Sequence, residues 1–220
     1  MELSDIALAR FNMIEQQIRP WNVLDTRILE LLSAVPREDF VPTAHRALAF
    51  ADLEIPLGHG ECMLAPRMEA RLLQDLQLKG SERVLEIGAG SGYMAALLAK
   101  QSGSVLSLEI NPDLADRARA NLHRAHIRNA EIRVADGATP LASDGLFDAI
   151  VLSGSVEQLP QHLLDQLALG GRLIAVVGEE PIMCATLVTR VGHADLRSSK
   201  LWDANAPRLH GFAERSHFHF

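Results

Sequence analysis

Residues 84–93 restrict the possible folds more than any other stretch, because they read VLEIGAGSGY. The letters VLEI are typical of a buried strand, and the glycines that follow predict a sharp turn. The alanine- and leucine-rich residues 94–99 then predict a helix. This order of strand, glycine turn and helix is typical of a nucleotide-type site at the carboxyl end of a first strand.

The spacing of the glycines narrows the class of nucleotide. They form the pattern G-x-G-x-G, whereas a dinucleotide turn has G-x-G-x-x-G, and Tyr93 stands where its third glycine would be. Glu86 lies two residues before the first glycine, and the next expected strand ends in Glu109. A carboxylate at that strand end can accept hydrogen bonds from both ribose hydroxyls. The pattern resembles that of S-adenosylmethionine-dependent methyltransferases, which implies S-adenosylmethionine as the cofactor.

Other polar residues are expected at the same edge of the sheet. Asp136-Gly137 follows the third strand, where it either hydrogen-bonds an adenine amino group or forms a plain turn. Glu86 either contacts the ligand or orients the glycine turn and an ordered water. The candidate cofactor-binding residues are Glu86, Gly88, Ala89, Gly90, Gly92, Glu109, Ile110, Asp136, Gly137 and Ser153.

After Gly80 the expected strands and helices alternate, which predicts an α/β fold with a doubly wound, Rossmann-like parallel sheet and helices on both faces. The expected strands are 83–87, 104–108, 131–135, 147–152 and 172–177, and the expected helices are 92–100, 112–124 and 160–168. The tail after Met183 predicts two or three antiparallel strands that end at Phe218 and Phe220.

The N-terminal part predicts a helical cap. Apolar residues at positions 7, 11, 14 and 18 suggest a first helix with one buried face. Asp25 is the expected N-cap of a second helix, loops with a short helix near 45–49 follow, and Pro66 begins a helix that runs to about Leu76. We therefore divide the chain into a cap with an active-site lid, residues 1–79, and a cofactor-binding α/β domain, residues 80–220, which form one structural unit.

Composition excludes several classes of protein. The formal net charge of −7, from 28 acidic and 21 basic residues, argues against sequence-independent nucleic-acid binding. Two cysteines, Cys62 and Cys184, do not make a disulfide framework. No apolar run is long enough to span a membrane, and the first residues do not resemble a signal peptide. We therefore expect a cytoplasmic protein that does not bind a membrane.

Residues 54–68 are rich in glycine and proline yet otherwise largely apolar, unlike a solvated loop. They form either a buried connector or a lid that excludes water from the reacting centre. The candidate substrate and lid residues are Gly58, Gly60, Cys62, Met63 and Leu64. His59, between the two glycines, is the candidate catalytic base if the acceptor is a hydroxyl or an amine, although it could simply order the loop.

The histidines near the C-terminus suggest a metal site only weakly. His217 and His219 could share one face of a terminal strand with His210 nearby, but no cysteine or acidic residue has ligand spacing with them, so we expect no metal. Trp21 and Trp202 are interpreted as packing or rim residues rather than as a substrate cage.

Several motifs resemble those of protein-L-isoaspartate O-methyltransferases along nearly the whole chain. The specific ones are VPREDFVP at 35–42 and PLGHG at 56–60, supported by APRM at 65–68 and by the glycine turn itself. The resemblance implies methyl transfer to a carboxylate of a peptide or protein substrate, in repair or modification of isoaspartyl sites.

The same resemblance identifies a departure in the lid. Where the family usually has Gln-Thr-Ile-Ser, this chain has Glu61, Cys62, Met63 and Leu64. The family's hydroxyl, thought to engage the substrate carboxylate, therefore falls on Leu64, which has no donor or acceptor. Two alternatives stay open: a divergent methyltransferase on a small molecule or another peptide, and a non-catalytic cofactor-binding module. The oligomeric state is not indicated by the sequence.

Overall fold

A seven-stranded sheet forms the centre of the computed structural model, which describes residues 3–140 and 144–214. Its strand order is β5-β4-β3-β6-β7-β8-β9, and the five strands from β5 to β7 are parallel to one another, whereas β8 and β9 are antiparallel. The strands are β3 (Arg83–Ile87), β4 (Ser104–Glu109), β5 (Ala130–Val134), β6 (Phe147–Val156), β7 (Leu167–Glu179), β8 (Ile182–Arg190) and β9 (Leu196–Asp203). The predicted α/β fold is confirmed.

The sheet reverses its winding at β3. This first strand of the parallel sheet pairs with β4 on one side and with β6 on the other, so the carboxyl end of β3 is a topological switch point. Ligands of open α/β sheets bind in the crevice beside such a point. The fold therefore places the glycine turn that follows β3 at the edge of the sheet where a ligand is expected to bind.

Helices cover both faces of the sheet unequally. The cap helices pack on one face together with α3 (Pro66–Leu76), α4 (Tyr93–Lys100) and α5 (Pro112–Arg124). Among the described helices, only the short α6 (Gln161–Asp165) lies in the apolar cluster of the other face. The bounds of α3 and α5 match the prediction. The predicted helix 160–168 is too long, because β7 already begins at Leu167, which pairs with Phe147 of β6.

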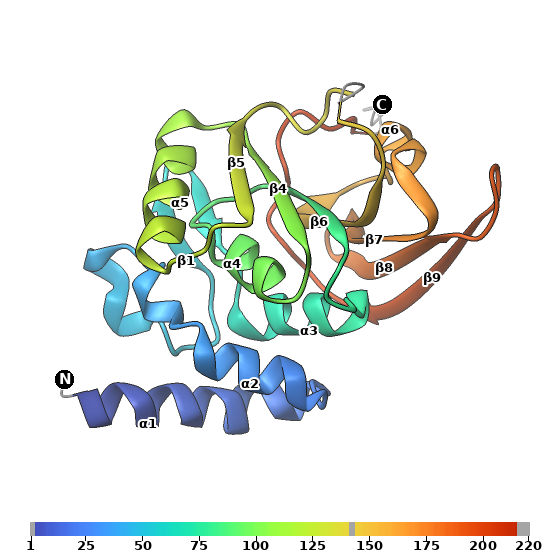
Figure 1. Cartoon of the computed structure of the whole chain (residues 1–220). Coiled ribbons are helices and arrows are strands. Elements are labelled where there is room, and N and C mark those ends of the chain that lie inside the picture. Colours follow the sequence, from blue (N-terminus) through green and yellow to red (C-terminus); the bar gives the residue numbers. More distant parts are fainter. Residues whose placement is uncertain (1–2, 141–143, 215–220) are drawn as a thin grey trace, which may run out of the picture.

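The first helix differs from its prediction. It begins as α1 (Leu3–Met13) and continues as a π-helical turn (Ile14–Ile18) along the outer side of the cap (Figure 1). The expected stripe is wrong at its start, since Phe11 is 59% exposed and Ala7 is exposed too, while Met13 is buried. In the first turns Ile6 and Ala9 pack half-buried against the core instead, so a different face of the helix meets it.

The second helix, α2 (Thr26–Ala34), agrees with the prediction. The carboxylate of Asp25 accepts the Arg27 backbone N–H at 2.9 Å, which satisfies one free donor at the helix start. Ile28 and Leu32 are buried in the same apolar core as the cap and the α3–α5 face of the sheet. A short 3₁₀ helix at Thr43–Leu48 corresponds to the predicted one near 45–49.

Residues 55–63 form a β-hairpin rather than the expected loop. Strands β1 (Ile55–Gly58) and β2 (Glu61–Met63) pair antiparallel around a two-residue turn, His59-Gly60. Both turn residues have positive φ, 58° and 84°, as a type I′ hairpin turn requires. The prolines and glycines that suggested a loop instead belong to this short ribbon.

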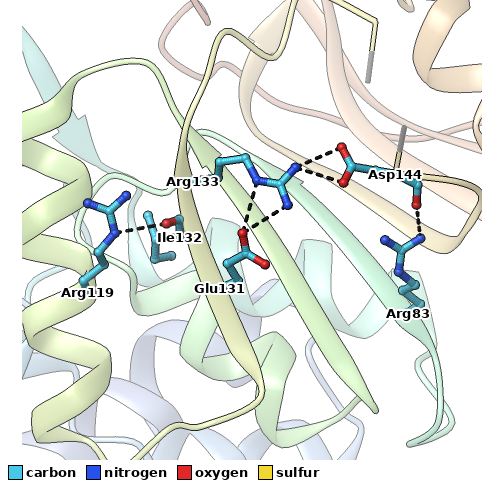
Figure 2. A network of polar contacts seen from close by, with 6 residues as sticks. All are labelled: Arg83, Arg119, Glu131, Ile132, Arg133 and Asp144. Atoms are coloured by element: carbon cyan, nitrogen blue, oxygen red, sulfur yellow. Dashed lines mark hydrogen bonds and ion pairs between the residues drawn. The ribbon is translucent and has the colours of Figure 1, made fainter. Parts of the chain in front are cut away.

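A polar network anchors the connection that leaves β5 (Figure 2). Arg133 on β5 donates two 2.9 Å hydrogen bonds to the Asp144 carboxylate and also pairs with Glu131. Arg83 at the start of β3 donates to the Asp144 backbone carbonyl, and Arg119 of α5 donates to the Ile132 carbonyl at 3.0 Å. Asp144 is therefore tied to the start of β3 and to β5.

The antiparallel tail is partly as expected. β8 and β9 are two such strands, whereas the predicted endpoints Phe218 and Phe220 lie outside the described residues, as do His217 and His219. None of the described helices combines the length and the apolar character that crossing a bilayer requires.

Candidate active site

A small cavity opens at the carboxyl ends of the central strands. Its walls come from the turns after β3, β4, β5 and within β6, from the β1–β2 hairpin, and from a C-terminal segment, residues 207–212. The lining residues are Glu61, Cys62, Ile87, Gly88, Gly90, Leu108, Glu109, Ile110, Leu114, Ala135, Asp136, Gly137, Ser153, Leu209, His210 and Phe212. Residues far apart in the sequence thus converge at the switch point.

The glycine turn contributes backbone to this cavity. Gly88 and Gly90 line it and both have positive φ. Ala89 and Gly92 are not among the lining residues, and a Cβ at Gly92 would meet Ala118 of α5 at 3.2 Å. Gly92 therefore allows α4 and α5 to approach each other.

Glu109 at the end of β4 faces the cavity from the side of the turn. Its carboxylate is 5% exposed and accepts the Gly90 N–H at 2.8 Å and the Asn111 N–H at 3.0 Å. It therefore joins the first two βα turns of the sheet, with Ile110 beside it on the cavity wall. An ionised carboxylate here is a strong acceptor for ligand hydroxyls.

Glu86 does not line the cavity but lies buried on β3 behind the cavity wall. Its buried carboxyl group is hydrogen-bonded by the Ser107 hydroxyl of β4 at 2.6 Å and by the Ser153 hydroxyl of β6 at 2.8 Å. Burial raises the pKa of Glu86 to about 8. These bonds go to two strand serines rather than to the glycine turn, and they position Ser153, which does line the cavity. A role of Glu86 toward the ligand stays a prediction.

Asp136 and Gly137 form the opposite rim. One Asp136 carboxylate oxygen accepts the Ala138 N–H at 2.9 Å, which makes a local turn. A Cβ on Gly137 would lie 2.4 Å from a methyl carbon of Ile87, so only glycine permits this approach to β3. The expected turn is therefore present and also lines the cavity, whereas a hydrogen bond to an adenine amino group stays a prediction.

The β1–β2 hairpin presents only part of the expected lid to the cavity. Glu61 and Cys62 line the cavity, whereas Met63 and Leu64 are buried in the core and do not. Gly58, His59 and Gly60 lie at the turn outside the cavity lining, and the His59 imidazole faces Asp113 of α5, with Nε2 3.4 Å from Oδ2.

Cys62 is held as a thiol. Burial and the nearby Glu54 carboxylate, whose Oε2 lies 3.7 Å from Sγ, raise the pKa of Cys62 to about 12. Because the thiolate is the nucleophilic form, Cys62 is not an activated nucleophile near pH 7.

The C-terminal segment closes the cavity, and the sequence analysis did not anticipate this. The Ser155 N–H of β6 donates to the Pro207 carbonyl at 2.7 Å and the Leu209 N–H returns to the Ser155 carbonyl at 2.9 Å. His210 Nε2 lies 2.8 Å from Glu61 Oε1, so this segment contacts the hairpin across the cavity mouth. No local motif marks these residues; only the pairing of the tail with β6 reveals them.

Arg37 fixes the wall behind the hairpin. Its guanidinium is fully buried, pairs with Glu69 of α3, and donates to the Leu64 carbonyl at 2.7 Å. The Tyr93 ring lies against the same guanidinium, 5.2 Å from its central carbon. The VPREDFVP motif therefore holds the backbone at the position of the missing hydroxyl.

The groups at the cavity suit a nucleoside ligand. The half-buried backbone of Gly88 and Gly90, the Glu109 carboxylate, the Asp136 turn and Ser153 surround it, and such groups can hydrogen-bond a ribose and an adenine. The free volume is about 60 Å³, however, compared with roughly 300–1,000 Å³ for typical ligand pockets. A Cβ on Gly88 would lie 3.0 Å from the Leu209 side chain, so the C-terminal segment packs closely over the glycine turn.

Within the described ranges 3–140 and 144–214, no three His, Cys, Asp or Glu side chains are grouped closely enough to hold a metal ion. His210 instead contacts Glu61.

Comparison with protein families gives a match along most of the chain. Residues 9–201 match the family model described as Protein-L-isoaspartate(D-aspartate) O-methyltransferase. A protein-L-isoaspartate O-methyltransferase of Methanoculleus marisnigri is 41% identical over 191 residues, 87% of this chain and 86% of its own. Protein-L-isoaspartate O-methyltransferase 1 of Rhodopseudomonas palustris is 40% identical over 211 residues, 96% of this chain and 86% of its own.

Solved structures show the same fold. A structure of a Plasmodium falciparum protein, described as an isoaspartate O-methyltransferase in complex with S-adenosyl-L-homocysteine, superposes with a TM-score of 0.77. It is 24% identical and covers 90% of this chain and 96% of its own. Another protein-L-isoaspartate O-methyltransferase has a TM-score of 0.79 at 23% identity, and the match covers 92% of this chain and 66% of that one.

Proposed function

Since the chain belongs to the protein-L-isoaspartate(D-aspartate) O-methyltransferase family, we propose that its switch-point cavity methylates the free carboxylate of isoaspartyl residues in peptides or proteins. The protein is an S-adenosylmethionine-dependent O-methyltransferase of this family. The observation that carries the site assignment is the convergence of Gly88, Glu109, Asp136 and Ser153 on one cavity.

In this proposal the cofactor side of the cavity is formed by the three βα turns. Glu109 accepts the ribose hydroxyls, and the backbone of Gly88 and Gly90 lies along the amino-acid part of the cofactor. The turn at Asp136-Gly137 borders the adenine. Glu86 acts through Ser153, whose hydroxyl it holds at 2.8 Å.

A carboxylate acceptor places few chemical demands on the chain. The acceptor carboxylate is ionised at pH 7. S-adenosylmethionine carries the methyl group on a sulfonium sulfur, and after methyl transfer this sulfur leaves as a neutral thioether. No general base or acid is then needed, and the residues contribute alignment and exclusion of water. His59 accordingly orders the hairpin turn in our proposal rather than accepting a proton.

Glu61 and His210 determine the charge that an approaching carboxylate meets. An ionised Glu61 alone would repel the acceptor, but its Oε1 lies 2.8 Å from His210 Nε2. The contact with the His210 imidazole occupies this oxygen of Glu61 and so lessens the repulsion that an approaching carboxylate meets. The absence of a hydroxyl at Leu64 reduces acceptor binding but removes no proton-transfer group, because the reaction needs none.

The test is methyl transfer from labelled S-adenosylmethionine to an isoaspartyl peptide and to the same peptide with normal aspartate. We expect label on the isoaspartyl peptide only. Calorimetric titration of the same preparation with S-adenosylmethionine establishes that the cofactor site is intact. If the cofactor binds and neither peptide is labelled, the isoaspartyl assignment is wrong.

A further inference from the structure

A second hollow of about 450 Å³ lies between α3 and the ends of β8 and β9, outside the cavity described above. We call it the Trp–Arg groove, since its most prominent lining residues are two tryptophans and two arginines. The lining residues used below are Trp21, Arg67, Met68, Arg71, Ile182 and Trp202. Ile182 is 80% exposed at the edge of this groove.

The two arginines stack on the two tryptophans. Arg67 and Arg71 lie one turn apart on α3, with their guanidinium carbons 4.0 Å from the Trp21 ring and 4.5 Å from the Trp202 ring. The Trp202 indole N–H is fixed by a 2.7 Å hydrogen bond to Asp75. Both cations are therefore held in place before any partner arrives.

Arg71 differs from Arg67 in its hydrogen bonding. Arg67 pairs with Asp52, whereas for Arg71 the described part of the chain provides no hydrogen bond or ion pair. Asp203 also lines the groove but is not paired with Arg71. A planar guanidinium with free donors matches a carboxylate, which it can bind through two parallel hydrogen bonds.

Two short segments connect the groove to the reaction cavity. Cys62 and Leu209 line the cavity, while Arg67 and Ala204 line the groove, five residues away along the chain in each case. Five residues of extended chain span at most about 18 Å. The near side of the groove therefore lies at most about 18 Å from the cavity wall, a distance that an extended peptide covers in about five residues.

From these observations we propose that the Trp–Arg groove binds an extended stretch of the substrate polypeptide that carries a carboxylate side chain about five residues from the methylated residue. The carboxylate pairs with Arg71, and neighbouring apolar atoms cover Met68 and Ile182. This inference rests on the proposed function, because it takes the substrate to be a polypeptide.

The experiment compares isoaspartyl peptides that differ at one position. One set carries Glu four, five or six residues to either side of the isoaspartate, and the matched set carries Gln. We expect kcat/KM for the best Glu peptide to exceed that of its Gln partner about tenfold. Arg71→Gln abolishes this difference, whereas Arg197→Gln, an exposed arginine on β9 outside the groove, preserves it. Equal rates for all Glu and Gln peptides overturn the proposal.

A second readout does not depend on methyl transfer. The chain contains two tryptophans, and both line the groove, so tryptophan fluorescence reports its occupancy. We expect saturable changes with an aspartyl peptide that carries Glu, at least tenfold weaker binding with the Gln peptide, and loss of the preference in Arg71→Gln. Fluorescence binding without methylation of any isoaspartyl peptide would refute the proposed function and support the groove. Methylation of the isoaspartyl peptide with no Glu preference in either assay would support the proposed function and refute the role of the groove.

Discussion

The two walls of the reaction cavity are built in different ways. The proposed cofactor wall, formed by Gly88, Gly90, Glu109 and Asp136, consists of turns at strand ends. Its bonds join neighbouring turns, as between Glu109 and Gly90, 19 residues apart. The acceptor wall depends on longer connections, such as that between Glu61 and His210, 149 residues apart. A wall made of local turns can be recognised in a sequence, whereas one made by distant segments depends on the complete fold.

Removing Arg37 should break the acceptor wall most strongly. Arg37→Met leaves Glu69 unpaired in the core, which costs about 3–5 kcal/mol of unfolding free energy. Burial already raises the pKa of Glu69 to about 7, so protonation relieves part of this cost and the loss is smaller at pH 6 than at pH 8. Urea unfolding at both pH values measures the effect.

The matched control is Arg46→Met, which removes an exposed ion pair with Asp39 and should cost less than about 1 kcal/mol. Equal losses for the two variants would mean that the buried pair does not hold the acceptor wall.

Glu109→Gln tests the cofactor wall. Replacing an ionised acceptor by a neutral amide should weaken S-adenosylmethionine binding about tenfold to a hundredfold, the range for hydrogen bonds to charged groups. Calorimetric titration measures the affinity. Asp116→Asn, an exposed carboxylate on α5, is the control and should leave the affinity unchanged. An unchanged affinity in Glu109→Gln would remove this residue from the ribose site.

Glu86, which lies behind the cofactor wall, should make the unfolding free energy of the protein depend on pH. Its pKa of about 8 in the folded protein exceeds the ordinary 4.5, so the folded state keeps a proton that the unfolded state releases. Its contribution to stability is therefore complete below about pH 4.5 and is lost as the pH rises to about 8, at no more than about 1.4 kcal/mol per pH unit.

Glu86→Gln lacks this titration while keeping a hydrogen-bonding side chain for Ser107 and Ser153. The difference in unfolding free energy between the parent and the variant should therefore shift in favour of the variant from pH 5 to pH 8. A difference that does not change with pH would show that Glu86 titrates normally.

His59→Asn should have the smallest effect. Asparagine tolerates the positive φ of 58° at this turn, so the hairpin is retained. We expect kcat/KM for the isoaspartyl peptide to change by less than about threefold, whereas loss of a general base costs about a hundredfold or more. A hundredfold lower kcat/KM in a variant that still folds would identify His59 as the general base. The acceptor wall would then supply a proton-transfer group as well as alignment.

The same contrast explains how far the sequence could be interpreted. The strand at 83–87, the helix at 112–124 and the turn residues Gly88 and Glu109 follow from apolar periodicity and glycine spacing, which are local properties. The His59-Gly60 hairpin was also marked locally, since two residues that accept positive φ favour a type I′ turn, but the prolines and glycines around it suggested a loop.

Other features had no local signal. Nothing near Leu209 or His210 indicates that the tail returns along β6, because that pairing depends on where β8 and β9 end. Phe11 was wrongly expected to be buried for the same reason, because its burial depends on what lies beside α1 and not on its spacing in the sequence. The buried side chain of Leu64 could be placed only once Arg37 was seen to hold its carbonyl.

The environment of Cys62 has a consequence for inhibitor chemistry. A pKa of about 12 instead of 9.0 lowers its thiolate fraction near neutral pH roughly a thousandfold relative to a free cysteine. Alkylating warheads and peroxide both require the thiolate, so they react slowly at this position although the side chain borders the cavity mouth. Covalent probes designed for cysteine are therefore poorly suited to this pocket, and the residue behaves there as a small apolar side chain.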